Sequence, residues 1–553
     1  MAASQCVDCG KRHPERVLVA SPFQSLIAHQ MLPTPSETVA IHDFLRATDA
    51  EIERRESDIA RLLCEVEELR RSSHRHKAII HPIRRLPSEI LGEIFQQLND
   101  VEAEKPYRYG LLPELRLLQP YMTSPRPHRA PLIFGEVCRQ WRAIALSLPS
   151  LWNSISLDCT SANIRRNITL CDVWLKRSGA LPLSIRFHRQ PRGLNDRVSS
   201  KEAQDHRDLI GTILPYSHRW RFVDLEQLPA LSYDALDQLP PESLPRLECL
   251  SVSYRYGDQS TSSMLSQTKP WAAFSIAPRL TYLLFDNVGG ANVMTRRGEP
   301  LGFPWSQLTH ICLEDCSLND CHHILSQAST AIACTFDVTR SSSLEPTPVS
   351  HLHLQNLKLT SAVELRELWD CLTCSSLSTL YVEDPQTHVH GLLEFLSRSG
   401  KTIEDFTLDS SALDDTQSLA CLRNMPILRR LTVEEFGTGT QFTDRVCEAL
   451  TLASEGTMSP LVPNLEYLHL IGASFSHRAM ARMLESRVRF SPHSSFKTVH
   501  LVTLRNMSDS AYGKLMTLGN LGLDIKVNIE CYEGGPEGSE ASDVDEADED
   551  ESD

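Results

Sequence analysis

A six-residue apolar frame, LxxLxL in its ideal form, recurs nine times between residues 247 and 501, and no other feature constrains the fold as strongly. The copies are Leu247, Leu250, Val252; Leu280, Leu283, Phe285; Leu308, Ile311, Leu313; Val349, Leu352, Leu354; Leu377, Leu380, Val382; Ile403, Phe406, Leu408; Leu428, Leu431, Val433; Leu465, Leu468, Leu470; and Phe496, Val499, Leu501. Trp220, Val223 and Leu225 form a candidate tenth copy. The copies start 25 to 41 residues apart, less evenly than in regular leucine-rich repeats.

Helical patterns lie between the frames, at residues 365–372, 391–398, 446–452 and 480–488. Short strands that alternate with helices require parallel pairing, and each unit can bury its apolar face only by stacking on its neighbours. We therefore predict an α/β fold in which residues 180–530 form a leucine-rich-repeat-like solenoid with a curved parallel sheet. Strand-like segments at 155–157 and 181–187, with a helix over 164–178 between them, indicate the entry into this domain.

Residues that alternate with the apolar strand positions are expected on the concave surface of such a solenoid. They mix aromatic rings, which supply contact area, with charges, which supply selectivity, and this mixture suits protein recognition. The predicted target-binding residues are Tyr282, His310, His351, His353, Tyr381, Asp405, Arg430, Tyr467 and His469, with Asp409, Glu434 and His500 on the same surface. The alternatives are a solvated sheet face without a binding role, or a target site on the ridge or the loops.

Three groups of cysteines are candidate metal or redox sites. Cys312, Cys316, Cys321, His322 and His323 cluster in sequence, but Cys316 fits the extended repeat LxxLxLxxCxL while Cys312 alternates to the opposite face, so we predict no metal there. The pair Cys371 and Cys374 ends an amphipathic helix without a redox context. Cys6, Cys9 and His13 supply at most three local zinc ligands, and the alternative is a flexible N-terminus over residues 1–33. We predict no cofactor.

A helix start precedes a heptad pattern over residues 34–78. Thr34 fits the N-cap, Pro35 the first helical position, and Glu37 the third position of a capping box. The seam consists of Ile41, Leu45, Thr48, Ile52, Arg55, Ile59, Leu62, Val66 and Leu69. About four heptads with two polar seam residues predict weak homodimerisation through a coiled coil. The alternative is a single amphipathic helix that lies on another part of the chain.

Two short amphipathic helices are predicted within residues 81–153. The first contains Pro87 and Glu89 in its first turn, followed by Ile90, Leu91, Ile94, Phe95 and Leu98 at helical spacing. The second carries the stripe Val137, Trp141, Ile144, Ala145 and Leu148. Two helices of this length cannot close a core alone, so they are expected to pack on something else, such as a partner protein.

These residues resemble an F-box, over residues 81–155. The wider layout, with Cys-x-x-Cys, a coiled coil, Pro-Ile-Arg-Arg-Leu-Pro at residues 82–87 and a repeat region, is similar to the F-box-like proteins of mushroom-forming fungi. The resemblance implies docking to the Skp-type linker of a cullin-RING ubiquitin ligase. The residues expected to dock or to form the domain core are Leu86, Pro87, Ile90, Leu91, Ile94, Phe95, Val137, Cys138 and Trp141. A proline-rich insertion near residues 100–130, expected to be disordered, splits the motif and decides whether it is competent.

Charge and cysteine usage exclude several classes of function. The net charge is −16, but residues 533–553 hold eleven acidic and no basic residues, which leaves −5 for the rest of the chain. We expect this tail to be disordered, and a body near neutrality has no broad basic field for nucleic acid. Sixteen scattered cysteines and no secretory signal favour reduced thiols in the cytoplasm or nucleus. No apolar run is long enough to span a membrane.

No catalytic motif appears in a supporting context, so we predict that the chain is not an enzyme. The leading hypothesis is a substrate-recognition adaptor of a Skp-cullin-F-box ubiquitin ligase, in which the F-box binds the linker and the solenoid binds a protein target of unknown identity. The main alternative is a coiled-coil and repeat scaffold without ligase function. A third hypothesis, an enzyme with a regulatory repeat domain, lacks a site.

Overall fold

A computed structural model of the chain describes most of the sequence. The described residues are 21–102, 122, 129–160, 163–189, 199–254, 272–286, 295–296, 299–300, 302–342, 347–384, 389–409, 413–435, 442–452, 461–472, 475–490, 496–503, 513, 517, 519 and 523–529. Cys6, Cys9, His13, most of the insertion at 100–130 and the acidic tail at 533–553 lie outside them. The chain divides into two compact units, Met1–Ile90 and Leu91–Asp553.

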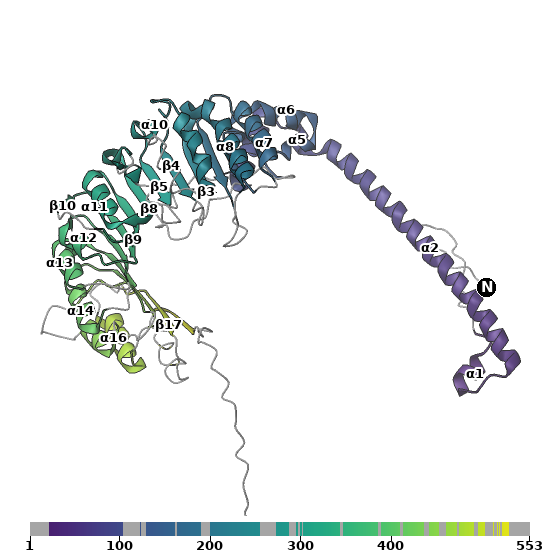
Figure 1. Cartoon of the computed structure of the whole chain (residues 1–553). Coiled ribbons are helices and arrows are strands. Elements are labelled where there is room, and N and C mark those ends of the chain that lie inside the picture. The colour runs from purple at the N-terminus through teal and green to yellow at the C-terminus, as the bar shows by residue number, and fades with distance from the viewer. Residues whose placement is uncertain are drawn as a thin grey trace, which may run out of the picture. The chain divides into compact units, whose positions relative to one another are not determined.

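The first unit contains α1 (Gln24–His29), α2 (Pro35–Ile80) and the 3₁₀ helix η1 (Pro82–Arg85), and Figure 1 draws α2 as a long uninterrupted helix. The predicted start of α2 is confirmed. The side chain of Thr34 accepts the N–H of Glu37 at 3.4 Å, and the Glu37 carboxylate accepts the N–H of Thr34 at 2.7 Å. These two hydrogen bonds satisfy backbone groups that the first helical turn leaves unpaired. The Thr34 hydroxyl also donates to the Glu37 carboxylate at 2.6 Å, and this bond, together with the one from the Thr34 N–H, lowers the pKa of Glu37. No residue of α2 is buried.

The predicted F-box region forms α3 (Ser88–Glu102), α5 (Phe134–Val137), α6 (Arg139–Ser147) and the 3₁₀ helix η2 (Pro149–Leu151). The second predicted helix is therefore two helices, because Cys138 is extended, with φ −162° and ψ 171°. Its thiol accepts the backbone N–H of Trp141 at 3.5 Å and caps α6. Phe95 of α3 stacks on Phe134, with ring centroids 4.3 Å apart, and lies 4.8 Å from the ring of Trp141. These rings hold α3 against α5 and α6.

Trp152 connects this helical region to the sheet that follows. Its indole N–H donates to the carbonyl oxygen of Ala145 at 2.8 Å. Its ring lies edge-on to Trp174 with centroids 4.8 Å apart, and the guanidinium of Arg177 lies 4.5 Å from the same ring. The helices of the F-box region thus complete part of their core on the chain itself, at the first strand–helix unit, rather than only on a partner.

The core of the second unit is a 14-stranded sheet in which every neighbouring pair is parallel, in the order β1-β2-β3-β4-β5-β8-β9-β11-β13-β14-β15-β16-β17-β18. The strands are β1 (Ser154–Asp158), β2 (Leu183–His188), β3 (Trp220–Leu228), β4 (Cys249–Tyr254), β5 (Tyr282–Asp286), β8 (His310–Ser317), β9 (Ala333–Arg340), β11 (Asn356–Ser361), β13 (Thr379–Glu383), β14 (Asp405–Asp409), β15 (Arg430–Glu434), β16 (Tyr467–Ile471), β17 (Thr498–Thr503) and β18 (Asp524–Ile529). Two small sheets pair β10 (Val349–His351) with β12 (Leu372–Cys374), and β6 (Thr295–Arg296) with β7 (Glu299–Pro300).

Helices connect the parallel strands and cover one face of the sheet (Figure 1). The α-helices are α7 (Ile164–Arg177), α8 (Ser200–Ile213), α10 (Ala272–Ser275), α11 (Leu318–Gln327), α12 (Arg366–Cys371), α13 (Val389–Ser399), α14 (Asp415–Arg423), α15 (Asp444–Leu450) and α16 (His477–Phe490). The 3₁₀ helices are η3 (Leu214–Arg219), η4 (Ala230–Gln238), η6 (Trp305–Gln307) and η7 (Gly400–Thr402). The prediction of an α/β chain with a long N-terminal helix and a parallel sheet is confirmed. Among the described residues, no helix combines the length and the apolarity needed to cross a membrane.

Nine of the ten predicted frames, counting the one at Trp220, coincide with strands of the sheet, and the frame at Val349 is wrong. Residues 349–351 form β10 of a small separate sheet, and Leu352 is 66% exposed. The strand comes later, as the frame Leu354, Leu357, Leu359 on β11. A frame on β9 was missed because it reads Ala331, Cys334, Phe336. With both corrections, the starts at residues 308, 331, 354 and 377 are each separated by 23 residues.

Candidate partner-binding surfaces

Helix α3 carries two apolar stripes. Leu91 and Phe95 are fully buried and form the core stripe. The second stripe consists of Ile90, Ile94, Leu98 and Val101, at positions i, i+4, i+8 and i+11 of the helix. Ile90 is 49% exposed, Leu98 43% and Val101 80%, while Ile94 is partly exposed. The first stripe accounts for the packing of α3, so the second, here called the α3 stripe, is left available for another surface.

The predicted docking residues divide into two groups. Leu91 and Phe95 are core residues, Cys138 is the cap of α6, and Trp141 packs on Phe95. The residues that keep exposed apolar surface are Leu86, Pro87, Ile90, Ile94 and Val137. The site prediction left out Leu98 and Val101. Their spacing from Ile90 was the available signal, but periodicity alone does not say which of two adjacent stripes faces the core.

The sheet face opposite the helices, here called the inner face, carries the residues that alternate with the buried strand positions. Strand register places the predicted residues in rows. Asp405, Arg430 and Tyr467 lie side by side in one row, and Tyr381 and His469 lie in the next, separated by two threonines. These side chains are exposed or partly exposed, so the inner face from β13 to β16 is accessible as predicted.

A row of three carboxylates occupies adjacent strands of this accessible region: Glu383 of β13 pairs in register with Asp409 of β14, and Asp409 with Glu434 of β15. Burial, together with the negative charges of Glu383 and Glu434, raises the pKa of Asp409 to about 6. Burial and the charge of Glu383 also raise the pKa of Glu434. The hydroxyl of Tyr381 donates to Glu383 at 3.2 Å. This carboxylate row has an unfavourable electrostatic energy that a bound cation would relieve.

Cationic and aromatic groups border the carboxylate row. The Lys358 ammonium lies 4.2 Å from the centre of the Tyr381 ring. Arg430 pairs with Asp405 at 3.0 Å, and its guanidinium lies 5.1 Å from the ring of Tyr467. The rings of His469 and His500 stack with centroids 4.9 Å apart, and burial, with a smaller contribution from His500, lowers the pKa of His469. The accessible inner face therefore has an acidic centre. The cationic side chains at its border, Lys358 and Arg430, already lie against aromatic rings.

The other half of the inner face is covered. Seven buried residues form one apolar cluster: Met122, Phe222, Cys249, Tyr282, Leu284, Cys312 and Ala333. Tyr282 is only 3% exposed, so the expectation that it lies on an accessible concave surface is wrong. Met122 belongs to the insertion, and its sulfur accepts the hydroxyl of Ser154 at 3.5 Å. The insertion thus supplies at least one side chain to the core, because an apolar strip on the sheet must be shielded from water.

Beside this cluster, the inner face of β2 to β4 holds buried charges that are already paired. Asp224 is fully buried and accepts the hydroxyl of Ser251 at 2.6 Å. Arg186 lies 3.3 Å from Asp224 and 2.5 Å from Glu226. One arginine thus lies between two carboxylates, and these side chains are engaged with one another across neighbouring strands.

The remaining predicted histidines belong to three different segments of the chain. His310 is on β8, partly buried at the edge of the apolar cluster. The inner-face positions expected for His351 and His353 are wrong, as a consequence of the shifted frame at Val349. His351 is on β10, buried, with its Nε2 2.6 Å from the carbonyl oxygen of Leu325. His353 is exposed in a bend before β11.

Cysteines of the repeat region are buried. Cys312 lies in the inner-face cluster, while the thiol of Cys316 donates to the carbonyl oxygen of Asp337 at 3.4 Å. Burial raises the pKa of Cys316, and it raises that of Cys374 to about 12, so both thiols are protonated at neutral pH. Within the described ranges, no three His, Cys, Asp or Glu residues are grouped closely enough to hold a metal ion.

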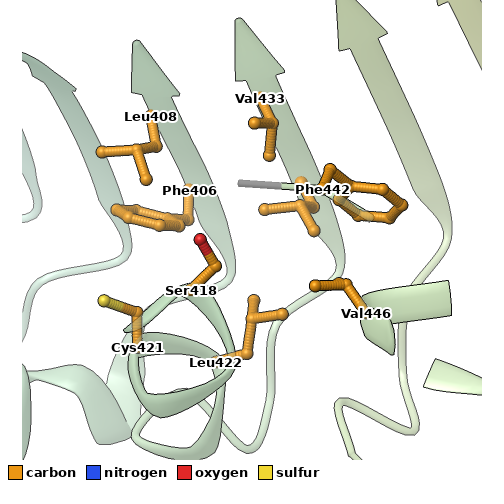
Figure 2. Close-up of a pocket in the computed structure, with 9 residues that line it drawn as sticks. Phe406, Leu408, Ser418, Cys421, Leu422, Val433, Phe442 and Val446 are labelled. Carbon is orange, nitrogen blue, oxygen red and sulfur yellow. The ribbon is translucent and has the colours of Figure 1, made fainter. Parts of the chain in front are cut away.

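A cavity of about 20 Å³ lies on the helix side of β14 and β15. Figure 2 shows Ser418 of α14 directing its hydroxyl toward Phe406, with Leu422 and Phe442 on the other walls. The lining residues are Phe406, Leu408, Ser418, Cys421, Leu422, Leu431, Val433, Phe442 and Val446. A cavity of this volume holds about one water molecule, so it is a packing feature and not a ligand site.

No model of a known protein family matches this sequence, and a comparison with curated proteins finds no matching sequence. The function must therefore be inferred from this chain's own residues.

Proposed function

We propose that this protein is a substrate-recognition adaptor of a Skp-cullin-F-box ubiquitin ligase. The observation that carries the proposal is the α3 stripe, an exposed apolar row on a helix whose other apolar row is already buried. A helix that exposes Leu98 and Val101 next to a packed aromatic core presents the apolar anchors that a helical partner surface buries. The partner is the Skp-type linker, and through it a cullin.

The sheet and its helices form a leucine-rich-repeat-like solenoid in this proposal, and the accessible inner face binds the target protein. The 23-residue spacing of four successive frames supports this assignment. The carboxylate row of Glu383, Asp409 and Glu434 favours a target segment that carries lysine or arginine, because a positive charge relieves the repulsion in the row. The adaptor itself performs no covalent chemistry. It raises the effective concentration of target lysines near the ubiquitin-conjugating enzyme.

Co-purification with a recombinant Skp-type linker tests the docking step. The double variant Leu98→Asp, Val101→Asp places two charges on the α3 stripe without touching the buried stripe, and we expect it to lose linker capture at least tenfold. The matched control is Gln97→Asp, an exposed polar position on the same helix, which should capture the linker like the wild type. Equal capture by all three proteins would refute the adaptor proposal.

A second candidate function is a scaffold without ligase activity, and the exposed apolar seam of α2 favours it. Ile59, Leu62 and Leu69 of this seam are each more than half exposed, which fits a helix that joins protein chains. The two functions differ in the next partner. An adaptor recruits cullin together with the linker. Capture of the linker without cullin would support the scaffold.

A further inference from the structure

We propose that α2 joins two copies of this chain in a parallel, in-register coiled coil, so that the protein acts as a dimer with two copies of its target-binding unit. This inference goes beyond the adaptor function, because linker docking requires only the F-box region of one chain. It assigns an occupant to the apolar seam of α2: the same helix of a second copy.

The seam residues fall into the two core positions of a heptad. The first core position, a, holds Leu45, Ile52, Ile59 and Val66, and the second, d, holds Ile41, Thr48, Arg55, Leu62 and Leu69. The apolar members from Leu45 onward are 42% to 70% exposed along the helix. This 46-residue helix buries none of its residues, and among the described residues its one aromatic contact is that of Phe44 with Phe23, so the apolar seam lacks a cover.

The choice of residues at the two core positions favours two parallel strands. Three of the four a positions are β-branched, at Ile52, Ile59 and Val66. The last two d positions are Leu62 and Leu69. β-Branched residues at a with leucine at d pack best in parallel two-stranded coiled coils, because the side chains enter the facing helix at different angles at the two positions.

The flanking charges oppose the antiparallel arrangement. The g positions, next to the seam, hold Glu51, Asp58 and Glu65 in the centre of the helix. Antiparallel helices place g positions against g positions, which brings these carboxylates toward one another, and the only bases near them are the arginines that each already pairs with on its own helix. Parallel helices place g against e of the partner, so Glu65 faces Arg70 of the second copy, and this attractive pair occurs twice by symmetry.

Arg55 supplies a register signal within the seam. Its Nε lies 2.8 Å from the carboxylate of Glu51 on the same helix, so the charge at this d position has its own counter-charge. In register, the two Arg55 side chains face each other at this d position. Each is neutralised by Glu51 of its own helix, and Glu56 of the second copy, which faces Glu51, adds a further carboxylate on each side. Any shift by a heptad would place Arg55 against leucine or threonine, which costs more than a position flanked by carboxylates.

Dimerisation has a consequence for recognition. Two inner faces joined through one coiled coil bind a target that carries two basic segments, or a dimeric target, with avidity beyond that of a single face. This consequence rests on the proposed function, whereas the dimer itself does not.

The mass of the full-length protein in solution tests the dimer, by sedimentation equilibrium over a range of concentrations. We expect the wild type to approach twice the mass of one chain, and Ile52→Glu with Ile59→Glu to remain at the mass of one chain. The matched control is Ser57→Glu, on the outer side of the helix, which should keep the dimer. A wild type that stays monomeric, or a seam variant that stays dimeric, would overturn the proposal. The seam variant should still capture the Skp-type linker, which separates failure of this inference from failure of the adaptor function.

Disulfide trapping tests the orientation, in a background with Cys6 and Cys9 replaced by serine. Leu69→Cys should crosslink with itself under mild oxidation, because parallel in-register helices bring the two d positions together. Native Cys64 is exposed on the outer side of the helix and is the internal control that should not crosslink. If chains with Leu45→Cys crosslink to chains with Leu69→Cys while Leu69→Cys does not crosslink with itself, the helices are antiparallel and the proposal is wrong.

Discussion

The Nε of Arg487 donates a hydrogen bond to the carbonyl oxygen of Leu450 at 2.9 Å, inside the apolar layer between sheet and helices. Its two terminal nitrogens donate to the carbonyl oxygens of Val462 and Leu461, also at 2.9 Å. Burial lowers the pKa of Arg487 to about 10, so the guanidinium remains charged at neutral pH. One cation thus ties the end of α15 to the residues just before β16.

We expect Arg487→Met to lower the free energy of unfolding by roughly 3 kcal/mol, because two buried carbonyl groups and a partly buried one lose a charged donor. Urea denaturation measures the change. Arg489→Met is the matched control two residues away, since its ion pair with Glu485 lies within one exposed helix face and contributes about 0.5 kcal/mol or less. A loss of equal size in the two variants would show that Arg487 has no special role.

The pKa of Asp409 predicts a pH dependence with a defined sign. Its pKa is about 6 in the folded chain, against 3.8 for the unperturbed group. Between these values the folded state binds the proton more tightly, so ionisation of Asp409 lowers the free energy of unfolding as the pH rises through this window. We expect Asp409→Asn to be more stable than the wild type at pH 7.5 and to unfold with a flatter pH dependence, as measured by urea denaturation.

Asp415 supplies the opposite sign as a control. A hydrogen bond from Thr443 lowers its pKa, so its carboxylate stabilises the fold above its unfolded pKa, and this contribution is lost as the pH falls. Asp415→Asn should therefore lower the free energy of unfolding at pH 7.5. If Asp409→Asn and Asp415→Asn shift stability in the same direction, the electrostatic account of the carboxylate row is refuted.

Local patterns in the sequence predicted most of the elements. The capping box at Thr34 and the strand frames were predictable because each depends on residues only a few positions apart. The frame at Val349 failed because three apolar residues at the right spacing do not distinguish the strand from the segment that precedes it. The frame at Ala331 was missed because alanine and cysteine occupy two of its three positions. Small residues can pack there as well as large ones, so the frame lacks the large apolar side chains that mark the other copies.

The candidate site was less predictable than the fold. Alternation placed Tyr381 and Tyr467 correctly on the inner face, but it also placed Tyr282 there as an accessible residue. Its burial depends on a cluster that includes Met122, which is 160 residues away in the sequence. No local pattern reports a contact of that kind, because the insertion has neither a repeat nor a periodicity that aligns it with the sheet.

Met122 provides a test of this covered half of the inner face. We expect Met122→Asp to lower the free energy of unfolding by about 2–4 kcal/mol, because an unpaired carboxylate would replace a thioether in a buried apolar cluster. Thermal unfolding of the full chain measures the loss. Met31→Asp is the control, since Met31 is 59% exposed, and it should leave the unfolding temperature unchanged. Equal unfolding temperatures for the Met122 variant and the wild type would mean that Met122 does not pack in this cluster in solution.

The cavity beside Ser418 predicts that a smaller and less polar side chain improves the core. Among the described residues the Ser418 hydroxyl has no hydrogen-bond partner, although it is directed into a space lined by Phe406, Leu422 and Phe442 (Figure 2). Removing this hydroxyl in Ser418→Ala should raise the free energy of unfolding by roughly 1 kcal/mol, because an unsatisfied polar group no longer has to be desolvated. Leu422→Ala removes atoms from the same wall and should lower it by about 2–5 kcal/mol, because the cavity grows. Urea denaturation compares the two variants with the wild type. A destabilising Ser418→Ala would show instead that the hydroxyl is satisfied by a water molecule held in the cavity, since the loss of that hydrogen bond would then outweigh the gain in desolvation.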